Sequence, residues 1–223
     1  MSIAQNIAEI KSHIDINKVK LVAVTKNHDV SAMLEAIAAG ITAVGENRVQ
    51  EMLSKHPEIT AHAGRTVEWH LIGHLQTNKV RQAIPVADLI HSVDSERLAL
   101  EIDKVAGKLN KRQDILIQVN VADEASKFGV RPEQALPLAR LISQLENVRL
   151  CGLMTIAPFS ENAEAVRPVF KELYQLFGEL TAMNLANTEI KWLSMGMTND
   201  YRIAIEEGSN LVRIGTGIFG SRK

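Results

Sequence analysis

Only one cysteine, Cys151, occurs among the 223 residues of the chain. A single cysteine cannot form a disulfide within the chain, which excludes the small secreted scaffolds that disulfides hold together. No uninterrupted apolar run reaches the length of a membrane span, and the first residues lack the basic and apolar segments of a secretory signal. We therefore expect a protein of the cytoplasm, a reducing compartment, that does not enter a membrane.

An excess of one charge is also missing, since 25 Lys and Arg stand against 26 Asp and Glu and the formal net charge is −1. Binding along nucleic acid or on an anionic membrane needs clustered positive charge, so we expect neither partner. Aromatic residues make up only 4% of the chain and include two tyrosines, Tyr174 and Tyr201. This scarcity limits any reaction that needs a tyrosine as an acid or base.

Short apolar runs rich in β-branched residues recur along the chain, with amphipathic stretches between them. With 46% hydrophobic and 23% charged residues, the chain can bury a sizeable core. The runs predict strands at residues 21–26, 42–45, 67–72, 89–93, 115–121, 150–154, 190–194 and 211–214. Helix patterns lie between them, at residues 30–39, 46–55, 76–84, 95–109, 132–146, 162–183 and 199–208.

This alternation of strands and helices is typical of an α/β protein with a parallel sheet. Eight such units most simply close into a single (β/α)₈ TIM barrel. An open doubly wound sheet is the alternative, although no GxGxxG turn follows the first strand. Apolar residues at 3, 7, 10 and 14 predict an extra N-terminal helix that covers part of the barrel wall. No linker or repeat divides residues 1–223, so we predict one domain.

Lys26 ends the first predicted strand, at the carboxyl edge where barrels carry their active sites. A lysine in this position either extends into solvent or serves as a nucleophile that forms a Schiff base with an aldehyde. Position alone leaves both interpretations open.

Two glycine-containing turns follow the last two predicted strands. Ser194 and Gly196 precede a helix pattern, and Gly215 and Thr216 follow the eighth strand. Glycine lets backbone N–H groups approach phosphate oxygens, and barrels frequently bind phosphate after strands seven and eight. Ordinary tight turns are the alternative interpretation.

Arg213 lies inside the eighth predicted strand, between two apolar residues. The period of two turns Leu211 and Arg213 toward the barrel interior, and Val212 and Ile214 toward the helices. A guanidinium inside a barrel needs a partner. That partner is either a buried acidic residue or an acceptor atom on a ligand.

His70 and His74 lie four residues apart and are candidate metal ligands. Two histidines four residues apart bind one metal when both lie on one helix face. Gly73 and the strand pattern break such a helix, and no neighbouring Glu or Cys completes a ligand set. We therefore predict no metal site.

Several segments, in order along nearly the whole chain, match one known family. They are residues 23–26 (AVTK), 45–51 (GENRVQE), 69–79 (WHLIGHLQTNK), 126–129 (SKFG), 152–154 (GLM), 193–197 (LSMGM) and 212–216 (VRIGT). The third segment is highly specific. The chain therefore resembles the pyridoxal phosphate homeostasis proteins, which are small barrel proteins related to alanine racemase.

The resemblance implies a barrel of the alanine racemase N-terminal domain type that holds pyridoxal 5′-phosphate (PLP) as an internal aldimine on Lys26. It implies that Arg213 lies near the pyridine nitrogen. It also implies that the phosphate lies at Ser194, Gly196, Gly215 and Thr216, and we add Asn47, His70 and Met154 as lining of the same pocket.

The resemblance further implies a protein of intracellular PLP homeostasis that buffers the cofactor, or delivers it to apo-enzymes, without turnover. Arginine beside the pyridine nitrogen disfavours ring protonation, which weakens the ring as an electron sink. Related racemases use a tyrosine from a second domain of the partner subunit, whereas neither Tyr174 nor Tyr201 lies at a predicted strand end. We assign no catalytic residue and expect a monomer. A weak PLP-dependent amino-acid racemase and a cofactor-free Schiff-base aldolase remain as alternatives.

Overall fold

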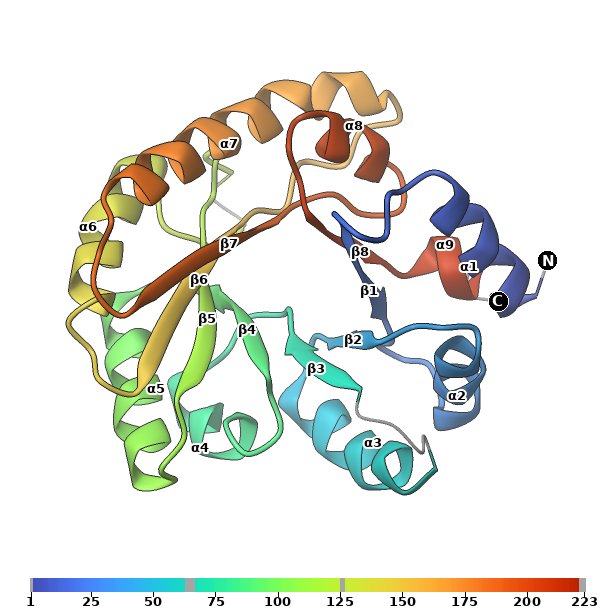
Figure 1. Cartoon of the computed structure of the whole chain (residues 1–223), viewed down its shortest axis with the longest axis horizontal. Coiled ribbons are helices and arrows are strands. Elements are labelled where there is room, and N and C mark those ends of the chain that lie inside the picture. The colour runs from blue at the N-terminus through green and yellow to red at the C-terminus, as the bar shows by residue number, and fades with distance from the viewer. Residues whose placement is uncertain (1, 63–66, 125–126, 221–223) are drawn as a thin grey trace.

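The strands pair in parallel and in chain order around a closed barrel, because β8 also pairs with β1 (Figure 1). The computed structural model describes residues 2–62, 67–124 and 127–220. Its strands are β1 (Lys20–Val24), β2 (Ala43–Glu46), β3 (Glu68–Leu71), β4 (Leu89–Val93), β5 (Gln113–Gln118), β6 (Val148–Met154), β7 (Thr188–Ser194) and β8 (Leu211–Ile214). Each predicted strand is present, and the predicted barrel is confirmed.

Helices surround the strands on the outside of the barrel (Figure 1). The longer ones are α1 (Ile3–Ser12), α2 (Val30–Ala38), α3 (Val49–His62), α5 (Glu96–Lys108), α6 (Pro132–Ile142) and α7 (Arg167–Ala182). The shorter ones are α4 (Val80–Ala83), α8 (Tyr201–Glu206) and α9 (Thr216–Phe219), together with the 3₁₀ turns η1 (Thr77–Lys79) and η2 (Ala163–Val166). No helix among these described elements is long and apolar enough to cross a membrane.

The N-terminal helix α1 covers the barrel wall beside α2 and α9, as the sequence predicts. Ser2 caps it, because the Ser2 side chain accepts a hydrogen bond from the backbone N–H of Gln5. Ile7 and Ile10 are buried under the helix. The Asn6 side chain donates a 2.8 Å hydrogen bond to the carbonyl of Ile218 in α9, which ties the first helix to the last.

The strands predicted at residues 21–26, 67–72 and 115–121 extend past the ends of β1, β3 and β5, and β1 and β5 end earliest relative to the prediction. β1 ends at Val24 rather than at Lys26, because Asn27 adopts a positive φ of 60° and turns the chain away from the sheet. β5 ends at Gln118, and Val119 forms only an isolated bridge with Val130. Lys26 therefore lies in the turn that follows β1.

Two apolar clusters divide the core. The larger one fills the layer between strands and helices and includes Val212 and Ile214. The smaller one lies inside the barrel and contains Val22, Ala43, Leu89, Leu116, Cys151, Met154 and Leu211. This division confirms the predicted facing of β8, with Leu211 inward and its two apolar neighbours outward.

Parts of the sequence predictions fall beyond the described residues. Ser126 of the segment at 126–129 is one, and the two extreme ends of the predicted domain 1–223 are others. The remaining site predictions all fall on described residues.

Candidate functional site

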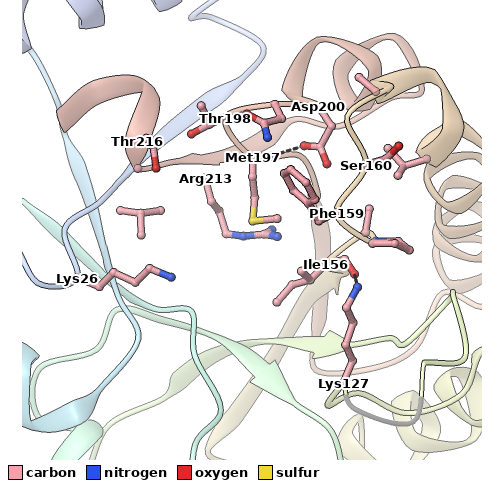
Figure 2. A pocket seen from close by; sticks show the side chains of 17 residues that line it. Lys26, Lys127, Ile156, Phe159, Ser160, Met197, Thr198, Asp200, Arg213 and Thr216 are labelled. Carbon is pink, nitrogen blue, oxygen red and sulfur yellow. Dashed lines mark hydrogen bonds between the residues drawn. The ribbon is translucent and has the colours of Figure 1, made fainter. Parts of the chain in front are cut away.

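A cavity of about 490 Å³ opens at the carboxyl end of the barrel, where β1, β7 and β8 end (Figure 2). Side chains from opposite sides point into it, with Lys26 on one side and Lys127 on another. The cavity is lined by Val24, Lys26, Lys127, Ile156, Ala157, Pro158, Phe159, Ser160, Ala163, Val166, Met197, Thr198, Asn199, Asp200, Arg213, Gly215 and Thr216.

The turn that carries Lys26 is held on both sides by hydrogen bonds. Before it, the backbone N–H of Thr25 donates to the carbonyl of Gly45 at 3.0 Å. After it, the backbone N–H of Asn27 donates to the Glu51 carboxylate at 3.1 and 3.2 Å. Lys26 itself is half-buried, with its amine at the cavity. These hydrogen bonds therefore fix the backbone on both sides of Lys26.

Glu46 lies fully buried behind this turn. Its Oε1 accepts hydrogen bonds from the Thr25 hydroxyl at 2.7 Å and from the Lys55 amine at 2.8 Å. Burial, together with the neighbouring Glu51 carboxylate, raises the pKa of Glu46 to about 7. Glu46 therefore titrates near neutral pH, next to the residues that support Lys26.

Arg213 reaches the cavity from inside the barrel and is only 3% exposed. One terminal nitrogen, Nη1, donates to the Ser194 hydroxyl, and the other, Nη2, donates to the carbonyl of Thr155 at 2.8 Å. Burial lowers the pKa of the guanidinium to about 10, and nearby Asp200 opposes that fall. Arg213 is therefore a charged donor at neutral pH, and its buried charge has neutral acceptors as direct partners.

The turn after β7 is built around Gly196 and Asp200. Gly196 has a φ of +93°, and a Cβ atom there would lie 2.6 Å from Cβ of Ala204. Oδ1 of Asp200 accepts a 2.6 Å hydrogen bond from the backbone N–H of Met197, which closes the turn (Figure 2). The carbonyl of Gly196 also accepts from the backbone N–H of Arg213. Only glycine fits this close approach without strain.

The turn after β8 meets the turn after β7 through one hydrogen bond. The backbone N–H of Gly217 donates to Oγ1 of Thr198 at 3.1 Å. A Cβ atom on Gly217 would lie 2.9 Å from Cγ2 of Ile214 in β8 and 3.2 Å from Cγ2 of Thr198 in the other turn, so a larger residue would press against both. The contact brings Thr198, Gly215 and Thr216 to one wall of the cavity.

Positive charge predominates in the cavity. Lys26, Lys127 and Arg213 line it together with one acidic residue, Asp200. Burial raises the pKa of Asp200, and Arg213 lowers it in part. Three cationic groups, threonine hydroxyls and glycine-containing turns suit an anionic ligand such as a phosphate ester.

The structure brings four of the residues predicted from the sequence to this cavity: Lys26, Arg213, Gly215 and Thr216. Asn47 lies next to Lys26 in a smaller adjoining pocket of about 190 Å³. Gly196 shapes the turn without lining the cavity. Ser194, His70 and Met154 are buried inside the barrel, so the structure does not place their side chains on the cavity wall.

Sequence reasoning missed several residues of the cavity wall. Lys127, Phe159 and Asp200 lie in loops after β5, β6 and β7. Loops carry no periodic pattern, so only the rule that the barrel site lies beyond the strand ends points to them. The family segment at residues 126–129 contains Lys127 and is the signal that was available.

Several proteins similar in sequence to this chain carry the same name. The family model described as alanine racemase, N-terminal domain, matches residues 1–223. A protein of Aquifex aeolicus (strain VF5) named pyridoxal phosphate homeostasis protein is 45% identical over 207 residues. The match covers 93% of this chain and 89% of the Aquifex protein.

Solved structures agree in fold. PipY of Synechococcus elongatus PCC7942, solved without PLP, has a TM-score of 0.91 and 38% identity, with coverage of 98% of this chain and 100% of PipY. A second PipY structure, with PLP bound, has a TM-score of 0.89 and 37% identity. Alanine racemase of Clostridium difficile 630 shares the fold at 17% identity, with a TM-score of 0.78 over 99% of this chain and 60% of the racemase.

Proposed function

The chain belongs to the alanine racemase N-terminal domain family, among the proteins named pyridoxal phosphate homeostasis protein, and on this premise we propose that it binds PLP and maintains its intracellular supply. The observation that carries the proposal is the meeting of Lys26 and Arg213 in one cavity at the carboxyl end of the barrel. PipY, a relative matched over 98% of this chain and 100% of its own, has been solved with PLP bound.

The residues of the cavity fit the chemical groups of PLP. An amine, Lys26, can attack the aldehyde, and a charged donor, Arg213, suits the unprotonated pyridine nitrogen. The threonine hydroxyls and the turn at Gly215 and Thr216 suit the phosphate. A cavity of about 490 Å³ lies in the size range of small-molecule sites.

Lys26 holds the cofactor covalently in this proposal. Its neutral amine adds to the aldehyde carbon and water leaves, so a C=N bond replaces the C=O bond and no other reactant is needed. Asn47 borders the Lys26 side of the site, and Gly196 sets the shape of the phosphate turn. Ser194 acts through its hydrogen bond to Arg213, while His70 and Met154 support the barrel interior beneath the site.

We favour a carrier over an enzyme. A guanidinium donor next to the pyridine nitrogen keeps that nitrogen unprotonated, which weakens the ring as an electron sink. Neither tyrosine lines the cavity, since Tyr174 is exposed on α7 and Tyr201 packs against Gly196. Racemisation needs an acid or base on each face of the reacting carbon. The proposed protein is a cytoplasmic monomer of one domain that makes PLP available to apo-enzymes.

Absorption spectroscopy tests the binding proposal. Wild-type protein mixed with PLP and freed of excess cofactor should retain a visible Schiff-base band, and Lys26→Ala should lose it. Lys104→Ala, at an exposed position of helix α5, is the matched control and should keep the band. A wild-type protein that cannot be loaded with PLP would disprove the proposal.

Hydrogen exchange separates the carrier from a racemase. Loaded protein is incubated with L-alanine in deuterated water, and the loss of the α-hydrogen is followed by proton NMR. With a carrier, the α-hydrogen of alanine should exchange no faster than it does with free PLP. Sustained exchange that Lys26→Ala abolishes would identify an enzyme instead.

A further inference from the structure

A line of polar side chains crosses the barrel interior from one end to the other. Glu68 begins β3 at the amino end, and its Oε2 lies 3.2 Å from Nε2 of His70. Nδ1 of His70 lies 2.9 Å from Nε2 of His91 in β4. Nδ1 of His91 lies 3.0 Å from Oγ of Ser194, which accepts from Arg213. We call these five residues the interior relay.

The middle of the interior relay is sealed from water. His91 and Ser194 are fully buried, and His70 is 1% exposed. Apolar side chains such as Leu116 and Met154 fill the rest of the barrel interior. An unpaired polar group costs free energy in such surroundings. Both ring nitrogens of each histidine have a partner, so the relay meets this requirement through its own members.

The hydrogen bonds of the interior relay have only one consistent direction. A guanidinium can only donate, so Oγ of Ser194 accepts from Arg213. The Ser194 hydroxyl proton then points to Nδ1 of His91, which accepts when the proton of His91 is on Nε2.

The same logic continues to the carboxylate. Nε2–H of His91 donates to Nδ1 of His70, and Nε2–H of His70 donates to Glu68. Burial lowers the pKa of both histidines, which agrees with neutral rings. The hydrogen bond from His70, followed by that from Lys20, lowers the pKa of Glu68 to about 2, which agrees with a charged acceptor at the end of the relay.

The reverse direction leaves groups unsatisfied. If each histidine carried its proton on Nδ1, Nε2 of His70 would face the Glu68 carboxylate with no proton between them. Ser194 would receive hydrogen bonds from both His91 and Arg213 and would lack an acceptor for its own proton. The negative charge of Glu68 at one end and the guanidinium of Arg213 at the other therefore select the same direction for the bonds between them.

We propose that Glu68, at the far end of the barrel, is a positioning residue for Arg213 and acts through His70, His91 and Ser194. Hydrogen bonds in series polarise one another, so a hydroxyl that donates to His91 is a better acceptor for Arg213. The bond to Ser194 and the bond to the Thr155 carbonyl then hold the guanidinium in one orientation toward the cavity. The proposal rests on the proposed function, in which Arg213 contacts PLP.

The histidine tautomers give the first test, and they are measured by ¹⁵N NMR on protein without added PLP. Wild type should show His70 and His91 as neutral rings with the proton on Nε2, assigned by the loss of each signal in His70→Gln and His91→Gln. Glu68→Gln removes the charge that fixes the direction at the amino end, because a glutamine side chain can also donate. We expect this variant to shift both tautomers and the Nε–H signal of Arg213.

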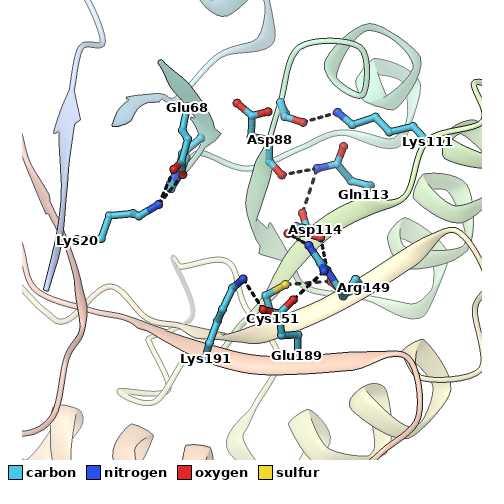
Figure 3. A network of polar contacts seen from close by, with 12 residues as sticks. Lys20, Glu68, Asp88, Lys111, Gln113, Asp114, Arg149, Cys151, Glu189 and Lys191 are labelled. Atoms are coloured by element: carbon cyan, nitrogen blue, oxygen red, sulfur yellow. Dashed lines mark hydrogen bonds and ion pairs between the residues drawn. The ribbon is translucent and has the colours of Figure 1, made fainter. Parts of the chain in front are cut away.

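Glu189→Gln is the matched control. Glu189 is 45% exposed, against 46% for Glu68, and it also pairs with cationic side chains, Arg149 and Lys191. Figure 3 shows it in a separate group from the Lys20–Glu68 pair. Glu189→Gln should leave the histidine and Arg213 signals unchanged. Lys20→Gln should also preserve the tautomers, because it keeps the Glu68 carboxylate.

PLP binding gives the second test. Outer partners of ligand-holding residues commonly change affinity, and across this relay we expect Glu68→Gln to weaken PLP binding roughly 3- to 10-fold while Glu189→Gln has no effect. Unchanged tautomers in Glu68→Gln would overturn the proposal, and so would altered tautomers with unaltered PLP affinity. If wild type failed to bind PLP, the proposed function would fall, whereas the NMR signals would still report whether the relay orients Arg213.

Discussion

The hydroxyl of Thr25 donates a 2.7 Å hydrogen bond to Oε1 of Glu46, a carboxyl group that is fully buried. The Lys55 amine donates to the same oxygen and to the carbonyl of Thr25. Thr25, the residue that precedes Lys26, is thus held by a carboxyl group whose pKa is raised to about 7. Both the stability of this turn and its pH dependence follow from that arrangement.

Replacement of Glu46 should remove one component of the pH dependence of stability. Because the folded protein raises the pKa of Glu46, its contribution to stability is present below the ordinary value of 4.5 and is lost as pH rises through about 7. Glu46→Gln mimics the protonated form and lacks this loss. In urea unfolding from pH 5 to pH 8, the free energy of unfolding of the variant should rise relative to that of wild type by about 1 kcal/mol per pH unit or less. Parallel pH profiles would contradict the assignment.

His91 should contribute a loss of stability in acid. Burial lowers its pKa well below 6.5, so the unfolded chain binds a proton that the folded protein excludes. The contribution is therefore present above about pH 6.5 and is lost as pH falls. Glutamine keeps a donor and an acceptor but does not titrate. As pH falls, His91→Gln should therefore lose less free energy of unfolding than wild type, by about 1 kcal/mol per pH unit. Exposed His62→Gln is the control and should follow wild type in urea unfolding.

Removal of the Arg213 guanidinium should weaken the cofactor site more than the fold. Arg213→Met fills similar space but cannot donate to the ligand, to Ser194 or to the Thr155 carbonyl. A charged hydrogen bond is worth about 1.5–3 kcal/mol, so we expect PLP affinity to fall about 10- to 100-fold by spectroscopic titration. Arg149→Met removes an equal charge from the network at the amino end of the barrel (Figure 3) and should preserve affinity. Equal PLP affinities in the two variants would show that Arg213 does not contribute to PLP binding.

A methyl group at Gly196 should damage the turn after β7. Its φ of +93° disfavours any other residue, and the added Cβ would lie 2.6 Å from Ala204 and 3.0 Å from Cα of Tyr201. We expect Gly196→Ala to lower the free energy of unfolding by about 1–3 kcal/mol. Gly178→Ala, at an exposed position of helix α7 with open space around it, should instead raise the free energy of unfolding by about 0.5–1 kcal/mol. Thermal and urea unfolding measure both, and a tolerated Gly196→Ala would show that the turn relaxes.

The fold could be predicted from the sequence because each strand is a short apolar run and the runs alternate with helix patterns. The ends of the elements were less predictable. Lys26 continues the apolar run of β1 in sequence, but the positive φ of Asn27 already turns the chain there. Helix α3 also continues past its predicted end at residue 55, through Pro57 to His62.

The site was predictable where a residue comes just after a strand, as Lys26, Gly215 and Thr216 do. It was less predictable where the role depends on contacts across the barrel. The sequence pattern indicated no role for His91 or Glu68, because a polar residue within a strand does not reveal its partners on other strands. The one available signal was the period of two, which places His91 on the same inward face as Leu89.

Chemical trapping tests the central claim, that Lys26 holds PLP, most directly. The protein is loaded with PLP, reduced with borohydride to make the Schiff base permanent, digested, and examined by peptide mass spectrometry. The account predicts one phosphopyridoxyl group per chain, attached to Lys26. Attachment to a different lysine with Lys26 unmodified, or no attachment at all, would contradict it.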